Sequence, residues 1–315
     1  MNRDRLVSGR KRLWRRIVAM ALMLAVASAV GWMAIRYSLV LYLLYVAVLL
    51  LIGVVAASTL VWMVNAWRTP DSLAESRLEA DGRDSAYSFS LIVPARHEEA
   101  VLETTLSRLI SSNHPDFEVL VVVGADDPGT RDVAERMADR YPERIRVVVD
   151  TSWPKSKPKA LNAALPYCAA AITGVFDAED DVHPALLRRV DQCFQATEAD
   201  IVQAGVQLMN FRSRWFTVHN VLEYYFWFRS RLHVHARQRF IPLGGNTVFI
   251  RTSILRAVSG WVDCLAEDCE IGVRLSALGA RTAVFYEPEL VTREECPPTL
   301  RSFVRQRTRW NQGYL

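Results

Sequence analysis

Two long apolar runs open the chain. Residues 17–35 form 19 consecutive uncharged positions, and residues 39–64 form 26 more. A helix rises 1.5 Å per residue, so each run is long enough to cross roughly 30 Å of hydrocarbon. A signal peptide is the alternative for the first run, but its apolar core would span roughly 7–15 residues and no second run would follow at once. We therefore predict two transmembrane helices within residues 17–67.

The pattern changes after a polar segment at 68–86, which we interpret as a linker. Short apolar runs rich in β-branched residues now alternate with segments of helical spacing. The apolar runs are 89–94, 117–127, 144–150 and 172–176, and the helical segments are 100–110, 131–140 and 159–171. Such alternation is typical of a mostly parallel sheet with helices on both faces. We therefore predict an α/β domain over residues 87–315.

The second half of this domain has a different texture. Residues 215–240 are dense in aromatic side chains, and as a helix this segment could lie in a membrane interface. Aromatic residues also dominate protein cores, so both interpretations stay open. Further predicted elements are a loop at 242–246, a helix at 267–279, a strand at 281–288 and a basic helix at 299–310.

Charge is concentrated at the N-terminus. The net charge is +4, and residues 1–16 alone hold seven Arg or Lys residues against one Asp. The basic balance is therefore local and does not favour nucleic-acid binding. A basic arm before an apolar run places the N-terminus in the cytoplasm by the positive-inside rule. Two spans return the chain to that side, so we expect a multi-pass protein of the cell membrane with a cytoplasmic domain.

Polar residues follow three of the four predicted strands. They are residues 96–99 after the first strand, 126–127 after the second and 177–181 after the fourth. In parallel sheets ligands bind beyond the carboxyl ends of the strands. We therefore expect these three groups to meet in one crevice.

The last of these groups is strongly acidic. Asp177 and Glu179 directly follow an apolar run, and their oxygens can hold a divalent cation whose remaining ligands come from a diphosphate. A calcium loop does not fit, because Val182 stands where glycine is required. Asp180 is expected to support this pair, and Asp181 to cap a helix that begins at Pro184.

Two charged groups remain ambiguous from the residues alone. The acidic cluster at 267–270 either complements a helix dipole or supplies a base that accepts a proton from a substrate hydroxyl. The lysines at 155, 157 and 159 precede a helix start, where they either contact a diphosphate or are simply solvated.

Taken together, these motifs resemble the family 2 glycosyltransferases, in particular the membrane-integrated branch with bacterial cellulose synthase and hyaluronan synthase. The resemblance runs from about Phe89 to the C-terminus. "LIVPARHEE" is similar to the family's first strand and nucleotide-binding turn, which implies donor contacts for Ala95 and Glu98. "VVVGADD" resembles the second strand, whose terminal aspartate meets uracil. This maps to Asp126, with Asp127 as a close rival.

The remaining motifs follow in the family's order. "KPKALN" resembles a diphosphate-contacting motif and implies that role for Lys157. "DAED" falls where the family has Asp-x-Asp, which implies ribose and metal roles for Asp177 and Glu179. "AEDCE" is similar to Thr-Glu-Asp, whose aspartate is the family's catalytic base and maps to Asp268.

"QRTRW" is an intact Gln-x-x-Arg-Trp motif. The resemblance assigns Gln306 and Arg309 to the donor and Trp310 to the acceptor. Membrane-integrated relatives continue past this motif into further spans, so we expect this chain to be truncated relative to them or to lack that half.

The resemblance implies an inverting transferase with the GT-A fold, a Rossmann-like mostly parallel sheet. It implies Mg²⁺ or Mn²⁺, a nucleotide-sugar donor that we expect to be uridine-linked, and a glycan or lipid-linked acceptor. The alternative is a non-catalytic membrane protein of the same fold that binds a nucleotide sugar or a lipid. A dinucleotide-dependent dehydrogenase is disfavoured, because the turn after the first strand lacks G-x-G-x-x-G.

Overall fold

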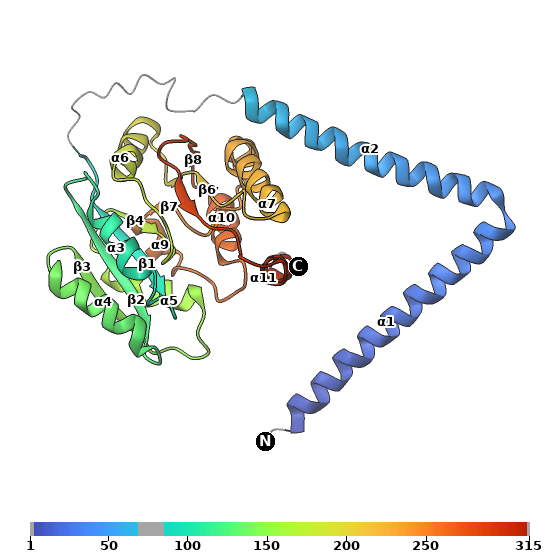
Figure 1. The fold of residues 1–315 in the computed structure, drawn as a ribbon, viewed down its shortest axis with the longest axis horizontal. Helices are drawn as coiled ribbons and strands as arrows, with labels where there is room; N and C mark the ends of the chain where they lie inside the picture. Colours follow the sequence, from blue (N-terminus) through green and yellow to red (C-terminus); the bar gives the residue numbers. More distant parts are fainter. Residues whose placement is uncertain (1–2, 69–84, 314–315) are drawn as a thin grey trace. The chain divides into compact units, whose positions relative to one another are not determined.

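The computed structural model describes residues 3–68 and 85–313 (Figure 1). The chain divides into two compact units, Met1–Val61 and Trp62–Leu315. Most of the predicted linker at 68–86 lies outside the described residues.

The first unit consists of one helix and most of a second, whose last residues, from Trp62 on, belong to the second unit. α1 (Arg3–Arg36) contains the basic arm and the first apolar run, and α2 (Ser38–Arg68) contains the second. Among the described helices, only Leu39–Asn65 within α2 is both long and apolar enough to cross a bilayer, and the apolar part of α1, Ile17–Met33, is shorter. Both predicted helices are therefore present, and the second has the dimensions of a span.

The second unit is built on a seven-stranded sheet with strand order β3-β2-β1-β4-β7-β5-β8. β1 to β4 run parallel, whereas β7 is antiparallel to both of its neighbours. The strands are β1 (Phe89–Ala95), β2 (Phe117–Gly124), β3 (Ile145–Asp150), β4 (Ile172–Val175), β5 (Ile201–Gln203), β7 (Val248–Arg251) and β8 (Thr282–Val284). A second, parallel sheet pairs β6 (Val206–Leu208) with β9 (Thr292–Glu294).

Helices cover both faces of the main sheet. Because side chains alternate along a strand, Leu91 and Val93 pack in one hydrophobic cluster while Ile92 packs in the other. The first cluster includes residues of α3 (Leu102–Ile110), α4 (Pro128–Arg140) and α6 (Leu186–Thr197). The second includes residues of α5 (Lys157–Ala164), α9 (Thr252–Ala257) and α10 (Glu267–Ala277). The predicted mostly parallel α/β fold is confirmed.

The aromatic segment forms a nearly continuous helical stretch. It comprises α7 (Trp215–Phe226), the π-helix η2 (Trp227–Arg231) and α8 (Leu232–Arg237). Asn65, near the end of α2 and within the second unit, donates from Nδ2 to Ser230 Oγ at 2.9 Å. The chain then forms α11 (Leu300–Gly313).

Two predicted elements are shorter than expected. The helix predicted at 159–171 ends as α5 at Ala164 and continues only as the 3₁₀ turn η1 (Leu165–Tyr167). Pro166 explains this end, because proline has no backbone N–H to continue the helical hydrogen bonds. The strand predicted at 281–288 is only the three-residue β8.

Candidate functional site

The carboxyl ends of β1, β2 and β4 form one edge of the sheet. β1 lies between the other two, and all three run parallel. Ala95 ends β1 with 4% of its surface exposed. From the turn that follows, Arg96 Nη2 donates to Asp126 Oδ2 after β2 at 2.9 Å. Polar residues after separate strands therefore meet, as the sequence pattern indicates.

The two aspartates after β2 have different environments. Asp126 is exposed and pairs with Arg96 on the surface. Asp127 is buried, caps α4 by accepting from Thr130 N at 3.3 Å, and accepts from His97 N at 2.6 Å. Burial opposes ionisation of Asp127, but these hydrogen bonds outweigh it and lower its pKa. Asp127 therefore has a structural role, which leaves Asp126 accessible to a ligand.

Lys157 connects the two halves of the domain. Its Nζ donates to Asp177 Oδ1 after β4 and to the carbonyl oxygen of Gly245, at 2.9 Å, in the loop before β7. Burial alone lowers the pKa of Lys157, but the carboxylates of Asp177, Glu267 and Asp268 outweigh it and raise the pKa. Lys157 is therefore a permanent cation among three acidic side chains.

Asp268 lies in the first turn of α10, facing the same loop. Its Oδ1 accepts from Cys269 N at 2.7 Å. A Cβ atom on Gly245 would lie 3.1 Å from Asp268 Oδ2 and 3.7 Å from Lys157 Nζ, so glycine permits this close approach. Burial raises the pKa of Asp268. Asp268 therefore combines the raised basicity of a general base with a cation nearby.

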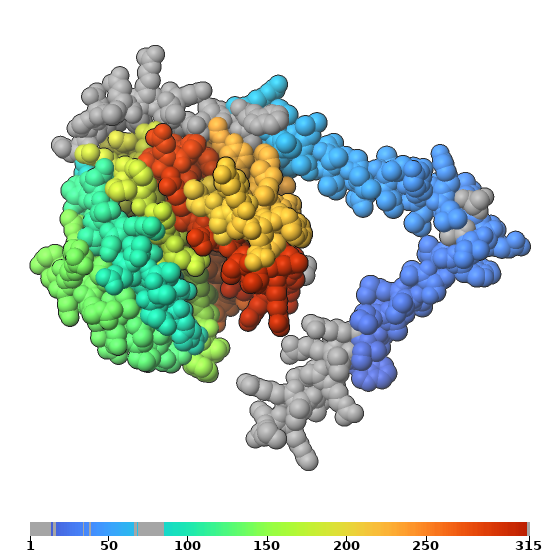
Figure 2. All heavy atoms as spheres, in the orientation of Figure 1, coloured from blue at the N-terminus to red at the C-terminus, as the bar shows by residue number. Residues whose placement is uncertain are grey.

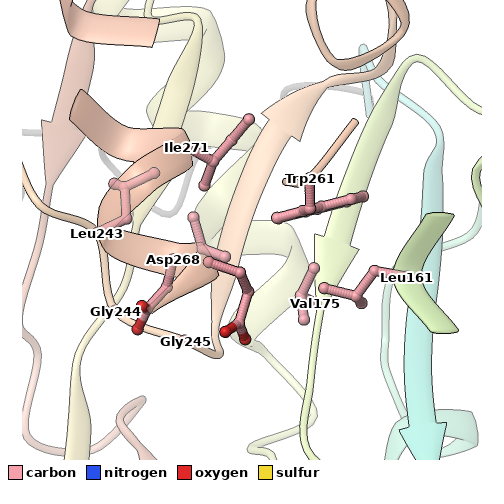
Figure 3. Close-up of a pocket in the computed structure, with 10 residues that line it drawn as sticks. Leu161, Val175, Leu243, Gly244, Gly245, Trp261, Asp268 and Ile271 are labelled. Atoms are coloured by element: carbon pink, nitrogen blue, oxygen red, sulfur yellow. The ribbon is translucent and has the colours of Figure 1, made fainter. Parts of the chain in front are cut away.

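A small, mainly apolar cavity lies behind these groups. Its lining includes Leu161 and Val175 on one side and Asp268 and Ile271 on the other (Figure 3). Glu267, the neighbour of Asp268, also lines it and is 9% exposed. The apolar wall supplies the desolvation that raises the pKa of both carboxylates.

Three carboxylates from two strand ends repel one another. Glu98, after β1, has a pKa raised by burial and then by the charges of Glu179 and Asp177. The pKa of Glu179 is likewise raised by desolvation and by Asp177. In the described part of the chain no group of three or more His, Cys, Asp or Glu side chains is arranged to hold a metal ion. Carboxylate oxygens are nevertheless hard ligands, and a divalent cation between these groups would relieve their repulsion.

Sequence reasoning missed a buried network behind the acidic motif. Asn246 Nδ2 donates to Asp180 Oδ1 at 2.9 Å and to Glu294 Oε1 in β9. Asp180 Oδ2 in turn accepts from Asp177 N at 2.8 Å. Burial raises the pKa of Asp180, and burial raises that of Glu294 to about 7. The network connects the "DAED" turn to the loop before β7. No local pattern in the sequence indicates that Glu294 lies beside the "PLGGN" loop in the folded chain.

The prediction that Asp181 caps a helix is wrong. α6 begins at Leu186, and no side chain caps it. The Asp181 backbone instead forms an isolated bridge with Arg293, and its carboxylate pairs with Arg108 at 3.3 Å. Four residues, 182–185, lie between Asp181 and the first residue of α6, so its side chain is too far from the free amides of the first turn to cap them.

The Gln-x-x-Arg-Trp motif lies on α11. Gln306 Oε1 is buried and finds no hydrogen-bond partner among the described residues, whereas Arg309 is exposed. The Trp310 ring lies 6.2 Å from that of Tyr224 on α7. A Cβ on Gly313 would meet Ala266 at 2.8 Å, so the end of α11 contacts the start of α10. The motif and the Asp268 turn are therefore neighbours.

Known proteins resemble this chain in fold and in part of its sequence. The structure of mannosyltransferase PcManGT from Pyrobaculum calidifontis, in complex with GDP-Man and Mn²⁺, matches with a TM-score of 0.60 at 22% identity and covers 84% of this chain and 72% of that one. This likeness supports the predicted GT-A fold.

Among curated proteins, the chain is 28% identical over 232 residues to the probable glycosyltransferase YdaM of Bacillus subtilis (strain 168), covering 71% of this chain and 54% of YdaM. It is 28% identical over 235 residues to the beta-monoglucosyldiacylglycerol synthase of Synechocystis sp. (strain ATCC 27184 / PCC 6803 / Kazusa), covering 71% of this chain and 47% of that protein. The chain thus spans about half the length of these relatives. The profile described as "Glycosyltransferase like family 2" matches residues 86–313, and the chain therefore belongs to this family.

Proposed function

We propose that the chain is an inverting glycosyltransferase that moves a sugar from a nucleoside-diphosphate sugar to an acceptor hydroxyl. One observation carries the proposal: the Asp268 carboxylate and the Lys157 ammonium approach the same backbone position, Gly245. A base beside a fixed cation can remove the acceptor proton while the cation neutralises the departing diphosphate. The raised pKa of Asp268 brings its basicity closer to neutral pH.

The residues after β1 and β2 are proposed to bind the donor. Asp126 is exposed and can accept a hydrogen bond from a nucleobase, and Ala95 and Glu98 lie at the end of β1, the neighbouring strand. Lys157 and, from α11, Arg309 are the groups proposed to contact the diphosphate. A uridine-linked donor is our expectation from the resemblance of the strand that ends at Asp126.

Asp177 and Glu179 are proposed to hold Mg²⁺ or Mn²⁺. Their mutual repulsion supports this role, and PcManGT, which shares the fold, is described with Mn²⁺ and GDP-Man. When bound, such a cation stabilises negative charge on the leaving diphosphate.

The acceptor is proposed to be a glycan or a lipid-linked sugar, with Trp310 offering its ring to it. The proposed setting is the cytoplasmic face of the cell membrane, with spans within residues 17–67 and the catalytic domain at 87–315. Support comes from the candidate span in α2 and from relatives named as synthases of a glycosylated diacylglycerol.

Replacing Asp268 with Asn tests the role of the base. We expect sugar transfer to fall by about 10²–10⁴-fold, while the donor dissociation constant measured by calorimetry stays within a few-fold. Asp263→Asn is the matched control, because Asp263 is exposed in the preceding loop and pairs with Lys159. Undiminished transfer by Asp268→Asn would remove Asp268 from this role.

The unmodified chain distinguishes the enzyme from a non-catalytic binding protein. Supplied with a panel of nucleotide sugars, a divalent cation and a membrane extract, the enzyme releases nucleoside diphosphate. Binding of a donor without any release would favour the non-catalytic alternative.

A further inference from the structure

Arg307 occupies the first unspecified position of the Gln-x-x-Arg-Trp motif, to which the resemblance assigns no role. It lies where α11 packs against α7, since the rings of Phe303 and Phe216 are 5.5 Å apart. Figure 2 shows the two helices, α7 in gold and α11 in dark red, side by side on one face. The side chain of Arg307 is only 20% exposed, so most of it is enclosed by this contact.

Two residues of α7 hold the guanidinium in place. Arg307 Nη1 donates to Glu223 Oε1 at 3.1 Å, and Nη2 lies 2.7 Å from Glu223 Oε2, which is the forked geometry of a guanidinium paired with a carboxylate. Nη2 also donates to Asn220 Oδ1. Asn220 is 1% exposed, and its Nδ2 donates to Cys296 Sγ at 3.5 Å. The guanidinium is therefore fixed by a bidentate ion pair and by a buried amide that is itself held.

The anchored guanidinium lies over the ring of Trp310. Arg307 Cζ is 4.3 Å from the centroid of the indole, within the roughly 6 Å of a cation–π contact. The Tyr224 ring of α7 is another neighbour, with its centroid 6.2 Å from that of Trp310. Trp310 is half-buried, so part of its ring stays accessible. A partly accessible side chain can occupy several rotamers, and these contacts select one of them.

We propose that Arg307 is a positioning residue that fixes the indole of Trp310 in the orientation that receives the acceptor. The inference rests on the acceptor role proposed for Trp310. A guanidinium suits this task, because its edge can bind a carboxylate and an amide while its flat face stacks on an aromatic ring. An arginine that only joined α7 to α11 would need Glu223 and Asn220, but not the stacked position over Trp310.

Fluorine NMR tests the position of the indole in the absence of substrate. The full chain is labelled with 5-fluorotryptophan in detergent micelles, and Trp310→Phe identifies the resonance of position 310 among those of the nine tryptophans. We expect Arg307→Met to move this resonance toward that of free 5-fluorotryptophan, because the ring loses its fixed surroundings. Arg307→Lys keeps a cation and should have a smaller effect. Arg305→Met is the matched control, because Arg305 is exposed on the same helix and its replacement removes the same charge.

Steady-state kinetics test the consequence for the acceptor. With a membrane extract as the source of acceptor, we expect the half-saturating amount of extract to rise by about 3–30-fold in Arg307→Met, the range that one cation–π contact represents. The dissociation constant of UDP, measured by calorimetry, should stay unchanged. Glu223→Gln weakens the anchor but keeps Arg307, so it should give the same changes to a smaller degree. It also keeps the test decisive if Arg307→Met does not fold.

Four outcomes would contradict this inference. They are an unaltered resonance of position 310 in Arg307→Met, an equal effect of Arg305→Met, an unchanged half-saturating amount of extract, and a parallel loss of UDP affinity. The last would show that Arg307 acts only through the stability of the domain. Absence of transfer by the unmodified chain would instead contradict the proposed function, and the NMR result would stand without it.

Discussion

The first and second halves of the catalytic domain place functional groups in different ways. In the first half, neighbouring parallel strands deliver polar residues to one edge directly after their apolar runs, as at Asp126 and Asp177. In the second half, strands of three or four residues and a loop bring together Asn246, Asp268 and Glu294. Function in the first half is local to each strand end, whereas in the second it depends on how distant segments pack.

This difference explains what holds the site together. The first half supplies exposed groups that can exchange a solvent partner for a ligand. The second half supplies groups whose positions depend on one another, such as Asn246 and Glu294, which form a network with the buried Asp180 of the first half. Substitutions in the first half should therefore affect binding, and those in the second should affect stability as well.

Substitution of Lys157 should have the largest effect, because its ammonium group contacts Asp177 in the first half and Gly245 in the second. Lys157→Met would leave Asp177, Glu267 and Asp268 without their cation, and we expect transfer to fall by about 10²–10³-fold. Lys157→Arg keeps the charge and should recover part of the loss. Lys155→Met is the matched control, because Lys155 pairs with Asp150 instead. Steady-state transfer with saturating donor is the measurement, and equal loss in both Met variants would contradict a specific role.

Glu294 should make the stability of the second half depend on pH. Its pKa is about 7 in the folded chain against an ordinary value of 4.5, mainly because it is buried and then because Asp177 is near. A raised acid pKa stabilises the fold fully below the ordinary value, and this contribution is lost as pH rises through about 7. The contribution is at most about 3 kcal/mol and is shared with the neighbouring Asp180.

Glu294→Gln should therefore flatten the fall in thermal midpoint between about pH 5 and pH 8. Chelator in the buffer removes any effect of bound cations. Glu295→Gln is the control. Glu295 is the next residue in the chain and is exposed, so this variant should leave the slope of thermal midpoint against pH unchanged. An unaltered slope in Glu294→Gln would assign the pH dependence to other groups.

Asn246 should contribute stability through its amide. Asn246→Ala leaves two buried carboxyl groups without their shared donor, so we expect the free energy of unfolding to fall by about 1–3 kcal/mol. Thr247→Val is a stringent control, because the buried Thr247 hydroxyl has no hydrogen-bond partner among the described residues. Denaturant unfolding in detergent measures both, and similar losses would show that any change in this loop is destabilising.

The same contrast governs what the sequence could predict. β1 to β4 are predictable because each is a short apolar run, rich in β-branched residues in β2, β3 and β4, and a helix separates each run from the next. β5, β6, β7 and β9 are too short for a periodic signal, and β7 reverses the sheet direction through a connection that no local pattern encodes. The prediction of the fold class therefore rested on the first half of the domain alone, and the complete sheet confirms it.

The candidate site divides similarly. Asp177 and Lys157 could be proposed from strand-end position and charge, and the structure pairs them. Asp268 needed the family resemblance, because a carboxylate at a helix start has an ordinary alternative role. Asn246 and Glu294 escaped notice, because their partners lie 48 or more residues away along the chain. Their environment arises from burial and from contacts between residues far apart in sequence, and neither is visible in a local sequence pattern.

Asp126 and Asp127 allow a closely matched comparison, since they are the same residue type at adjacent positions, and we expect their substitution to have the smallest effects. Asp127→Ala removes the cap of α4 and an acceptor for His97 N, so we expect a loss of about 1 kcal/mol in unfolding free energy. Asp126→Ala breaks only a surface pair with Arg96 and should cost almost no stability. Donor binding should respond in the opposite order, with Asp126→Ala weakening the nucleotide affinity more. Calorimetric titration of nucleoside diphosphate and denaturant unfolding separate the two effects. If Asp127→Ala weakened binding more at unchanged stability, the structural and ligand-binding assignments would have to be exchanged.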